Sequence, residues 1–287
     1  MVIPAGVENI FEATFRGCTS LVAVTIPDTV TSIGQAAFGD CSSLKTIEIP
    51  DGVEKIDFYA FELCKSLKEI YIPKSVTEIK SGAFSGCVGV SSIKVAEDNP
   101  VYHSGGNCII KTDSKTVIVG CKASVIPNGV VAIGTHAFRE CDSLTKIVIP
   151  SSVSRVDNGA FLMCRNLSLV VLPNSVATVA MCGFDICNSL ETVLYTGTED
   201  EWDGISFGAL NSDIREADIK YNYQAPAIIG DVNGDLEINN IDASLVLKYD
   251  TGILDFGEDK LLAADFNNDG EVNNVDAVQI LKYDAGL

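Results

Sequence analysis

The sequence predicts a mixed fold, in which a solenoid of short strands and helical turns precedes a small all-α domain. Three observations support this prediction. Phenylalanine, cysteine and proline recur every 23 residues through most of the 287-residue chain. The period stops after Tyr223. Beyond that point, one acidic segment occurs twice, first from Asp231 and again from Asp265.

The repeating unit is seen most clearly from Pro27 to Ile49, where a cysteine follows the phenylalanine by three residues and a leucine follows the cysteine by three. The phenylalanines of the seven units are Phe15, Phe38, Phe61, Phe84, Phe138, Phe161 and Phe184. One unit of this length cannot bury its own apolar face. Stacked units place like residues over like and build one continuous core, so the period predicts a solenoid.

Each part of the unit has its own expected structure. The L-x-x-I-x-I segment alternates like a strand, and A-F-x-x-C fits a short helical turn. Proline ends each strand because it cannot donate to a ladder. Seven strand positions are expected to point outward: Thr25, Glu48, Tyr71, Lys94, Val148, Val171 and Leu194. The last three, with Leu169, form an apolar stripe. It is either a partner site or ordinary sheet surface.

The period is interrupted once, because Pro73 and Pro127 lie much further apart than one unit requires. The insertion covers about residues 96–126, and its part from Asn107 to Cys121 reads as a hairpin. If the turn is centred between Ser114 and Lys115, Cys108 faces Cys121. A cross-strand disulfide between these two residues is then one of the two alternatives, and two free thiols are the other. The repeat cysteines are expected to be buried free thiols.

Residues 195–224, with the only tryptophan (Trp202), depart from the unit and are expected to cap the open core. Residues 1–224 as a whole resemble the BspA-like class of bacterial leucine-rich repeat proteins. The resemblance rests on the A-F-x-x-C-x-x-L-x-x-I-x-I-P units, the hairpin insertion and the G-T-x-x-x-W cap. It implies a leucine-rich-repeat solenoid, a fold that serves protein binding, adhesion or spacing.

The C-terminal part of the chain, from Ile228 onward, is strongly acidic. It has 13 Asp and Glu against three Lys and carries over half of the net charge of -19. Its acids and amides fall at positions 1, 3, 5, 7, 9 and 12 of two loops, which is the oxygen spacing of a calcium site. The expected ligands are Asp231, Asn233, Asp235, Glu237, Asn239 and Asp242, then Asp265, Asn267, Asp269, Glu271, Asn273 and Asp276. Gly270 supplies the turn at position 6 of the second loop, where the first has Leu236.

After a short linker at 225–228, residues 229–287 resemble a type I dockerin. The features are the duplicated loop, Asp at position 12 and the missing entering helix, which makes each half an F-hand-type loop. The resemblance implies two bound Ca²⁺ ions and binding to the cohesin domain of a scaffoldin. The family's partner-choice positions correspond to Asn240, Ile241, Leu247, Lys248, Asn274, Val275, Leu281 and Lys282. The two halves are so alike that either helix could face a cohesin. Alternatively, the apolar members only pack the domain core.

Composition excludes several other functions. The acidic charge argues against nucleic acid and against an anionic membrane surface, and no apolar run is long enough to span a bilayer. The two histidines, His103 and His136, lie in different units, and no nucleophile, zinc or phosphate-loop motif occurs. We therefore expect no catalytic residues and no enzyme activity.

The sequence therefore predicts a non-catalytic, extracellular cellulosome component that is monomeric apart from its cohesin complex. Its solenoid would act as a protein-binding or adhesion module in polysaccharide degradation; carbohydrate binding and inhibition or regulation of an enzyme are the alternatives. The extracellular location follows from the resemblance, because Val2-Ile3-Pro4 already reads as a repeat remnant and not as a signal peptide.

Overall fold

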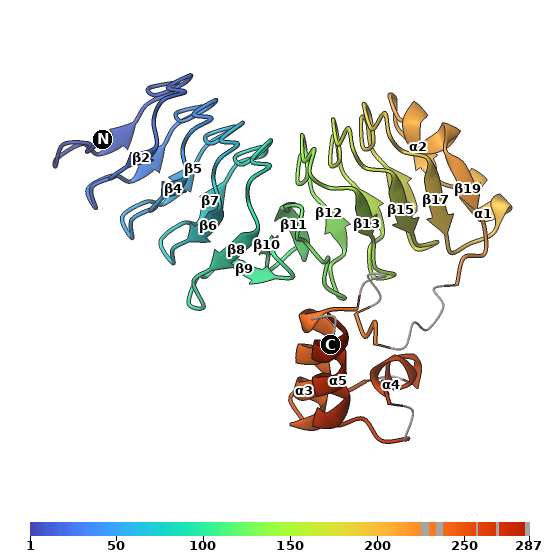
Figure 1. The fold of residues 1–287 in the computed structure, drawn as a ribbon. Helices are drawn as coiled ribbons and strands as arrows, with labels where there is room; N and C mark the ends of the chain where they lie inside the picture. The colour runs from blue at the N-terminus through green and yellow to red at the C-terminus, as the bar shows by residue number, and fades with distance from the viewer. Residues whose placement is uncertain (225–229, 234–237, 257, 268–269, 285–287) are drawn as a thin grey trace. The chain divides into compact units, whose positions relative to one another are not determined.

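The computed structural model describes residues 1–224, 230–233, 238–256, 258–267 and 270–284. The chain forms two compact units, Met1–Asn222 and Tyr223–Leu287. The first is a β-solenoid of about nine turns, whose coils lie side by side from the N-terminus to β19 (Figure 1). The described residues of the second unit include three short helices.

Every coil of the solenoid contributes one strand to each of two sides. One side holds β2 (Ala23–Val24), β4 (Thr46–Ile47), β6 (Glu69–Ile72), β8 (Ser92–Val95), β13 (Lys146–Val148), β15 (Leu169–Leu172), β17 (Thr192–Tyr195) and β19 (Asp218–Lys220). The other holds β1 (Asn9–Ile10), β3 (Ser32–Ile33), β5 (Lys55–Ile56), β7 (Glu78–Ile79), β12 (Ala132–Ile133), β14 (Arg155–Val156), β16 (Thr178–Val179) and β18 (Ser206–Phe207). Regular coils pair in parallel with the spacing of the sequence repeat, as Ile33 pairs with Ile56.

The repeated phenylalanines form two ring stacks inside the solenoid. Phe15, Phe38, Phe61 and Phe84 stack with centroids 5.1–5.3 Å apart. Phe138, Phe161 and Phe184 stack at 4.7–5.0 Å. The A-F-x-x-C segments are single tight turns. In six of the seven units the cysteine N–H donates to the phenylalanine carbonyl three residues back, at 3.2 Å for Cys41 and Phe38, whereas Cys187 N–H donates to Asp213 Oδ2 at 2.8 Å. Three-residue spacing alone does not separate a single turn from the start of a helix.

The insertion is a three-stranded antiparallel sheet between β8 and β12 (Figure 1). Its strands are β9 (Tyr102–Gly105), β10 (Cys108–Lys111) and β11 (Thr116–Val119). The predicted hairpin corresponds to β10 and β11, while β9 is an additional strand that the hairpin prediction did not include. Because β11 pairs in parallel with β12, the insertion also takes the place of a coil in the sheet.

Strands β10 and β11 divide the solenoid interior into two cores. Ile109 and Val119 pack into the core that contains the first phenylalanine stack. Ile110 and Val117 pack into the core that contains the second stack. Alternate side chains of a strand point to opposite faces, so this hairpin is buried on both faces. We call β10 and β11 the septum. Double burial explains why both strands read as unbroken apolar runs.

The predicted opposition of Cys108 and Cys121 is wrong. Ile110 pairs with Val117, and a bulge between Ile109 and Ile110 shifts the register so that Ile109 pairs with Val119. The turn therefore lies between Lys111 and Thr116, one residue earlier than expected, and Cys108 and Cys121 are out of register. Cys108 packs with the second core, Cys121 with the first, and all ten cysteines are free thiols.

The C-terminal end of the solenoid is covered by the irregular last coil. Helix α1 (Glu199–Asp203) starts at the capping box of Thr198 and Glu201. Helix α2 (Ser212–Glu216) follows β18. Trp202 is buried, with its ring 5.2 Å from Tyr195 and 5.4 Å from Phe207. The unusual sequence of this coil thus supplies a large aromatic lid where no further repeat stacks.

The second unit contains α3 (Asn240–Asp250), α4 (Glu258–Ala264) and α5 (Asn274–Asp284). Helices α3 and α5 pack against each other. Their inner faces supply the buried core residues Ala243, Val246, Ala277 and Ile280. So small a core needs additional stabilisation, and the acidic loops ahead of α3 and α5 are the candidate source.

Candidate functional sites

The first acidic loop is closed by the carboxylate at its position 12. Asp242 is fully buried. Its Oδ1 accepts backbone hydrogen bonds from Val232 (2.8 Å) and Asn233 (3.0 Å), and its Oδ2 accepts one from Asn239 (3.0 Å). Asn239 also caps α3 by accepting from the N–H of Ile241. Positions 9 and 12 therefore tie the loop to the first turn of the helix.

The second loop repeats this arrangement. Asp276 is fully buried and accepts backbone hydrogen bonds from Asn267 (3.2 Å) and Asn273 (3.0 Å). Asp265 accepts from the N–H of Gly270 at 2.9 Å. Gly270 has a φ of 88°, a conformation that costs glycine little. It is thus suited to the turn at position 6.

Nine of the twelve predicted ligands lie in the described residues, and they fall into two groups, one in each loop. Asp235, Glu237 and Asp269 lie outside the described residues, as does Leu236. Within the described residues, no three His, Cys, Asp or Glu side chains form a metal-holding cluster; four of the nine donors are asparagines. Carboxylate and amide oxygens are the donors that Ca²⁺ prefers, so this chemistry fits the ion.

The predicted partner-binding residues lie on the surface of the helical unit. Ile241, Leu247, Val275 and Leu281 are each about two-fifths to one-half exposed, and none belongs to the domain core. Asn240, Lys248, Asn274 and Lys282 are also exposed. The alternative, that the apolar members only pack the core, does not match this burial. Two similar faces remain, one on each of α3 and α5.

The outward strand positions of the solenoid differ between its two halves. Thr25, Glu48, Tyr71 and Lys94 are exposed, while Val148 and Leu194 are partly buried. Val171 retains only 6% of its surface and contradicts the expectation of an exposed residue. It is paired between Val148 and Leu194 on the neighbouring strands, both of which carry aliphatic side chains.

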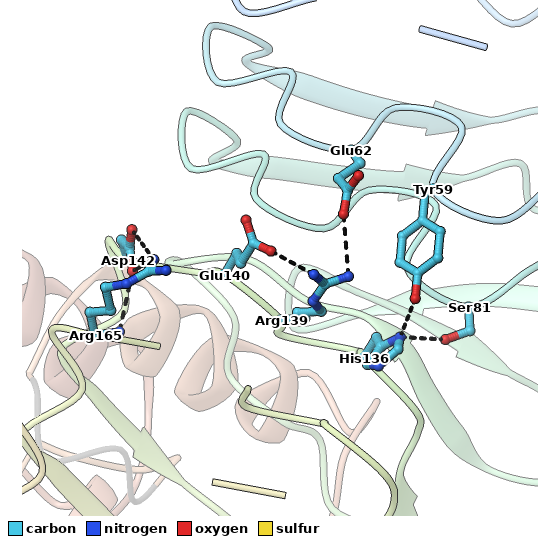
Figure 2. Close-up of polar contacts among 8 residues, drawn as sticks. All are labelled: Tyr59, Glu62, Ser81, His136, Arg139, Glu140, Asp142 and Arg165. Carbon is cyan, nitrogen blue, oxygen red and sulfur yellow. Dashed lines mark hydrogen bonds and ion pairs between the residues drawn. The ribbon is translucent and has the colours of Figure 1, made fainter. Parts of the chain in front are cut away.

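The turn side of the solenoid carries a polar cluster that joins coils on either side of the insertion (Figure 2). The insertion leaves this side in register, because Gly86 N–H donates to Arg139 O just as Leu63 N–H donates to Ser85 O. The cluster contains Tyr59, Glu62, Ser81, His136, Arg139 and Glu140, and we call it the turn-side cluster. Its members come from the turns around Phe61, Phe84 and Phe138.

Arg139 is the centre of the charged part of this cluster. It pairs with Glu62 at 3.2 Å and with Glu140 at 2.9 Å, and its guanidinium lies 5.3 Å from the ring centre of Tyr59. Burial raises the pKa of Glu62, and the charge of Arg139 opposes that rise. Because Glu62 and Arg139 belong to coils that are not adjacent, this pair spans the coil between them.

His136 forms the neutral part of the cluster. Its Nδ1 lies 3.1 Å from Ser81 Oγ and 3.3 Å from Tyr59 Oη. Its opposite edge lies over Gly159, where an added Cβ would come within 2.6 Å of the ring. Burial lowers the pKa of His136, and Arg139 lowers it further. Both edges of the ring meet protein, so His136 contacts residues from the turns around Phe61, Phe84 and Phe161.

The cysteine column forms a second regular network. Each of five thiols donates to the phenylalanine carbonyl of the preceding coil, as Cys64 Sγ does to Phe38 O at 3.2 Å. Burial raises the pKa of Cys41 to about 11 and that of Cys87 to about 12. Nucleophilic cysteines need a lowered pKa, so these thiols are structural.

Comparison with known proteins agrees with this geometry. The sequence model of the BspA type leucine rich repeat region, in six copies, matches residues 1–105 and 119–224. That of the dockerin type I domain matches residues 229–283. The chain belongs to the BspA-type leucine-rich repeat family and ends in a type I dockerin domain. No curated protein matches it closely.

Several solved structures resemble this BspA-type protein. A leucine-rich repeat protein from Eubacterium ventriosum is 26% identical over 68% of this chain and 59% of its own, with a TM-score of 0.54. A leucine rich cell surface protein from Faecalibacterium prausnitzii is 24% identical over 71% of this chain and 73% of its own, with a TM-score of 0.46. The likeness to the Eubacterium ventriosum structure supports the solenoid fold. This chain spans less than two thirds of the length of that protein.

The family assignment has direct functional content. A type I dockerin implies a cohesin partner in a cellulosome-type assembly, and a leucine-rich repeat region implies a protein-interaction module. Both domains are typically non-catalytic and suggest an extracellular or cell-surface protein. Among the described residues, no helix is long and apolar enough to cross a bilayer.

Proposed function

We propose that this protein is a non-catalytic subunit of a cellulosome-type assembly, in which the dockerin binds a scaffoldin cohesin in a calcium-dependent manner. The supporting observation is the duplicated loop and helix. In both copies, the position-12 aspartate ties its loop to a helix that exposes apolar side chains. Two Ca²⁺ ions, one in each loop, would supply positive charge to the acidic loops.

The residues of the chain itself would hold the loops and helices in the binding arrangement. Asp242 and Asp276 orient the first turns of α3 and α5 through their backbone hydrogen bonds. These helices then present apolar side chains flanked by lysine near the helix end. Removal of the ions would leave like-charged carboxylates close together in each loop and favour its opening.

Calorimetric titration of the full chain against a panel of type I cohesin domains tests this proposal. One arm contains calcium and the other contains a chelator. We expect at least one cohesin to bind at a 1:1 ratio with calcium and none to bind with chelator. Binding that survives chelation, or no binding by any cohesin, would contradict the proposal.

We further propose that the solenoid is a protein-binding or adhesion module. The partly exposed Val148, Leu169 and Leu194 lie on the outward side of its C-terminal half and support this role. A carbohydrate-binding role is the second candidate, because Tyr71 is exposed on the outward side of the other half, and sugars stack on aromatic rings.

Affinity electrophoresis in gels containing soluble cellulose or xylan derivatives separates the first two roles. A protein-binding solenoid migrates at the same rate in all gels, relative to an inert reference protein. Retardation that disappears in Tyr71→Ala would instead support carbohydrate binding.

A further inference from the structure

The two halves of the dockerin are not equivalent on their exposed faces. The inward positions match closely: Ala243 and Val246 in α3 correspond to Ala277 and Ile280 in α5. The outward positions differ at the middle of the face. At 3.6 residues per turn, residue 278 lies between 275 and 281 on one helix surface, and residue 244 lies between 241 and 247.

The middle residue decides whether the apolar surface is continuous. In α5 it is Val278, which is 48% exposed between the exposed side chains of Val275 and Leu281. In α3 it is Ser244, which is also exposed and separates Ile241 from Leu247 with a hydroxyl. Helix α5 therefore offers an unbroken apolar stripe of three aliphatic side chains, and α3 offers two separated ones.

The segment after α3 adds apolar surface next to the start of α5. Ile253 is 71% exposed and Leu254 is 39% exposed. Both residues donate backbone N–H bonds to Lys248 O, at 2.8 and 3.1 Å, which fixes the segment against the end of α3. They line one hollow together with Val272, two residues before α5 begins. The added apolar surface thus lies between the end of α3 and the N-terminal end of α5.

The tyrosine near the end of α5 is more exposed than the tyrosine near the end of α3. Tyr249 in α3 stacks on Phe256 with ring centres 4.6 Å apart, and this contact partly buries it. Tyr283 in α5 meets Phe266 at an edge, 6.0 Å away, and remains 59% exposed. Aromatic and aliphatic side chains that lose water on contact contribute most to an interface.

We infer that the α5 face, made of Val275, Val278 and Leu281, is the main cohesin-binding surface of this chain, and that the α3 face is a weaker one. This inference rests on the proposed cohesin binding and specifies which of two similar faces the partner uses. Val278 is then the residue that distinguishes them, and Ser244 is its counterpart in the other repeat.

Matched substitutions at the start of each helix test the inference in the full chain. Val275→Asp and Ile241→Asp each place a charge on one face. An acidic residue in the first turn of a helix is favourable, so neither change should unfold its helix. Calcium titrations followed by circular dichroism verify folding. The probe is the type I cohesin domain that binds the unmodified chain most tightly in the panel.

We expect Val275→Asp to weaken cohesin binding more than tenfold and Ile241→Asp to weaken it less than threefold. Val278→Ser should weaken it about tenfold, the factor expected from about 1.4 kcal/mol of lost apolar contact. In the double swap Ser244→Val with Val278→Ser, the order of the two Asp variants should reverse.

Two outcomes would overturn the inference while leaving cohesin binding established. One is an equal effect of the two Asp variants, with only their combination abolishing binding, because the faces would then be interchangeable. The other is a larger loss in Ile241→Asp. If no cohesin binds the unmodified chain, the proposed function fails, and this inference fails with it.

Discussion

At the scale of single residues, burial makes most of the cysteine thiols unreactive and leaves them a packing role in the core. Eight of the ten cysteines are buried, while Cys18 is exposed and Cys182 is half-buried. Burial raises the pKa of the Cys141 thiol to about 12. The thiolate is the form that reacts with alkylating agents. Both access and ionisation therefore disfavour reaction in the folded protein.

We predict that iodoacetamide at about pH 8 modifies Cys18, and at most Cys182 in addition, in the native protein. Intact mass spectrometry counts the added groups. The same treatment in guanidinium without reductant should modify all ten thiols, since Cys108 and Cys121 are out of register. A mass that shows only eight modified thiols would instead indicate a disulfide.

Phe161 is the central ring of the second stack and is fully buried between Phe138 and Phe184. Phe161→Ala should lower the free energy of unfolding by about 3–5 kcal/mol, because it removes packing on both sides of the ring. Urea unfolding followed by Trp202 fluorescence measures this loss. The control is Phe58→Ala, on a partly exposed ring, which should cost less than about 1 kcal/mol.

At the scale of elements, the septum predicts that neighbouring residues of one strand stabilise different halves of the solenoid. Ile109 packs with the first core and Ile110 with the second, which also contains Trp202. Each Ile→Ala change should cost about 2–5 kcal/mol. Repeat arrays can unfold in parts. The loss of stability can therefore affect one half of the solenoid in one variant and the other half in the other.

Urea unfolding of Ile109→Ala and Ile110→Ala, followed by both circular dichroism and tryptophan fluorescence, tests the septum. We predict that Ile110→Ala lowers the urea concentration at the midpoint of the fluorescence transition. Ile109→Ala should mainly shift the first part of the dichroism transition to lower urea concentration. Equal shifts of the fluorescence midpoint in both variants would mean that the solenoid unfolds as one unit.

The turn-side cluster predicts a dependence of solenoid stability on pH. The pKa of His136 is lowered by burial and by Arg139. Between about pH 7 and 5, near the ordinary histidine pKa, the unfolded chain therefore binds more protons at this residue than the folded chain. Stability contributed by neutral His136 is present above this window and is lost as the pH falls through it. The raised pKa of Glu62 acts in the opposite sense at the acidic end.

We therefore expect the urea midpoint of the solenoid to fall between pH 7 and pH 5.5, and His136→Gln to reduce that fall. His103→Gln is the control, because His103 is exposed on β9 and lies outside the cluster. A pH dependence that is unchanged by His136→Gln, or that is reduced equally by His103→Gln, would exclude the cluster as its source.

The elements that the sequence predicted are those with a pattern of their own. Phe38 and Cys41 recur in register, so the coils could be placed from spacing alone. Strand β9, with the sequence Tyr-His-Ser-Gly, follows no repeat period and contributes only Tyr102 to the core, so it was missed. The contact between Tyr59 and His136 depends on Gly86 bonding directly to Arg139 across the insertion. The number of residues between Tyr59 and His136 does not reveal that their coils lie so close together.

At the scale of the whole molecule, the chain combines two ways of compensating for a small repeated unit. The solenoid buries aliphatic and aromatic columns between stacked coils. The dockerin has too few core residues for that solution and instead places acidic loops ahead of two of its helices. Asp276→Ala should therefore weaken calcium binding at least tenfold, because it removes a proposed ligand and two backbone hydrogen bonds.

Calorimetric calcium titration measures the effect of Asp276→Ala, with Asp284→Ala as the control on the exposed end of the same helix. The control should bind calcium like the unmodified chain. If Asp276→Ala also left calcium affinity unchanged, the second loop would not be an ion site.

Prediction of the dockerin site from sequence was limited by what a spacing motif can show. Donor positions follow directly from the two 12-residue loops. The burial of Asp242 and its three backbone bonds do not, because they depend on how the helix start packs against its loop. The difference between Ser244 and Val278 was visible in the sequence, but its meaning depends on which helix surface is exposed.

The central claim is that calcium-dependent cohesin binding attaches an intact solenoid to a larger assembly. Size-exclusion chromatography with light scattering tests it directly, on an equimolar mixture of the full chain and its tightest type I cohesin. With calcium, we predict one peak at the summed mass of a 1:1 complex. With chelator, we predict two separate peaks and an unchanged solenoid dichroism signal. A complex that persists in chelator, or separate peaks in calcium, would contradict the account.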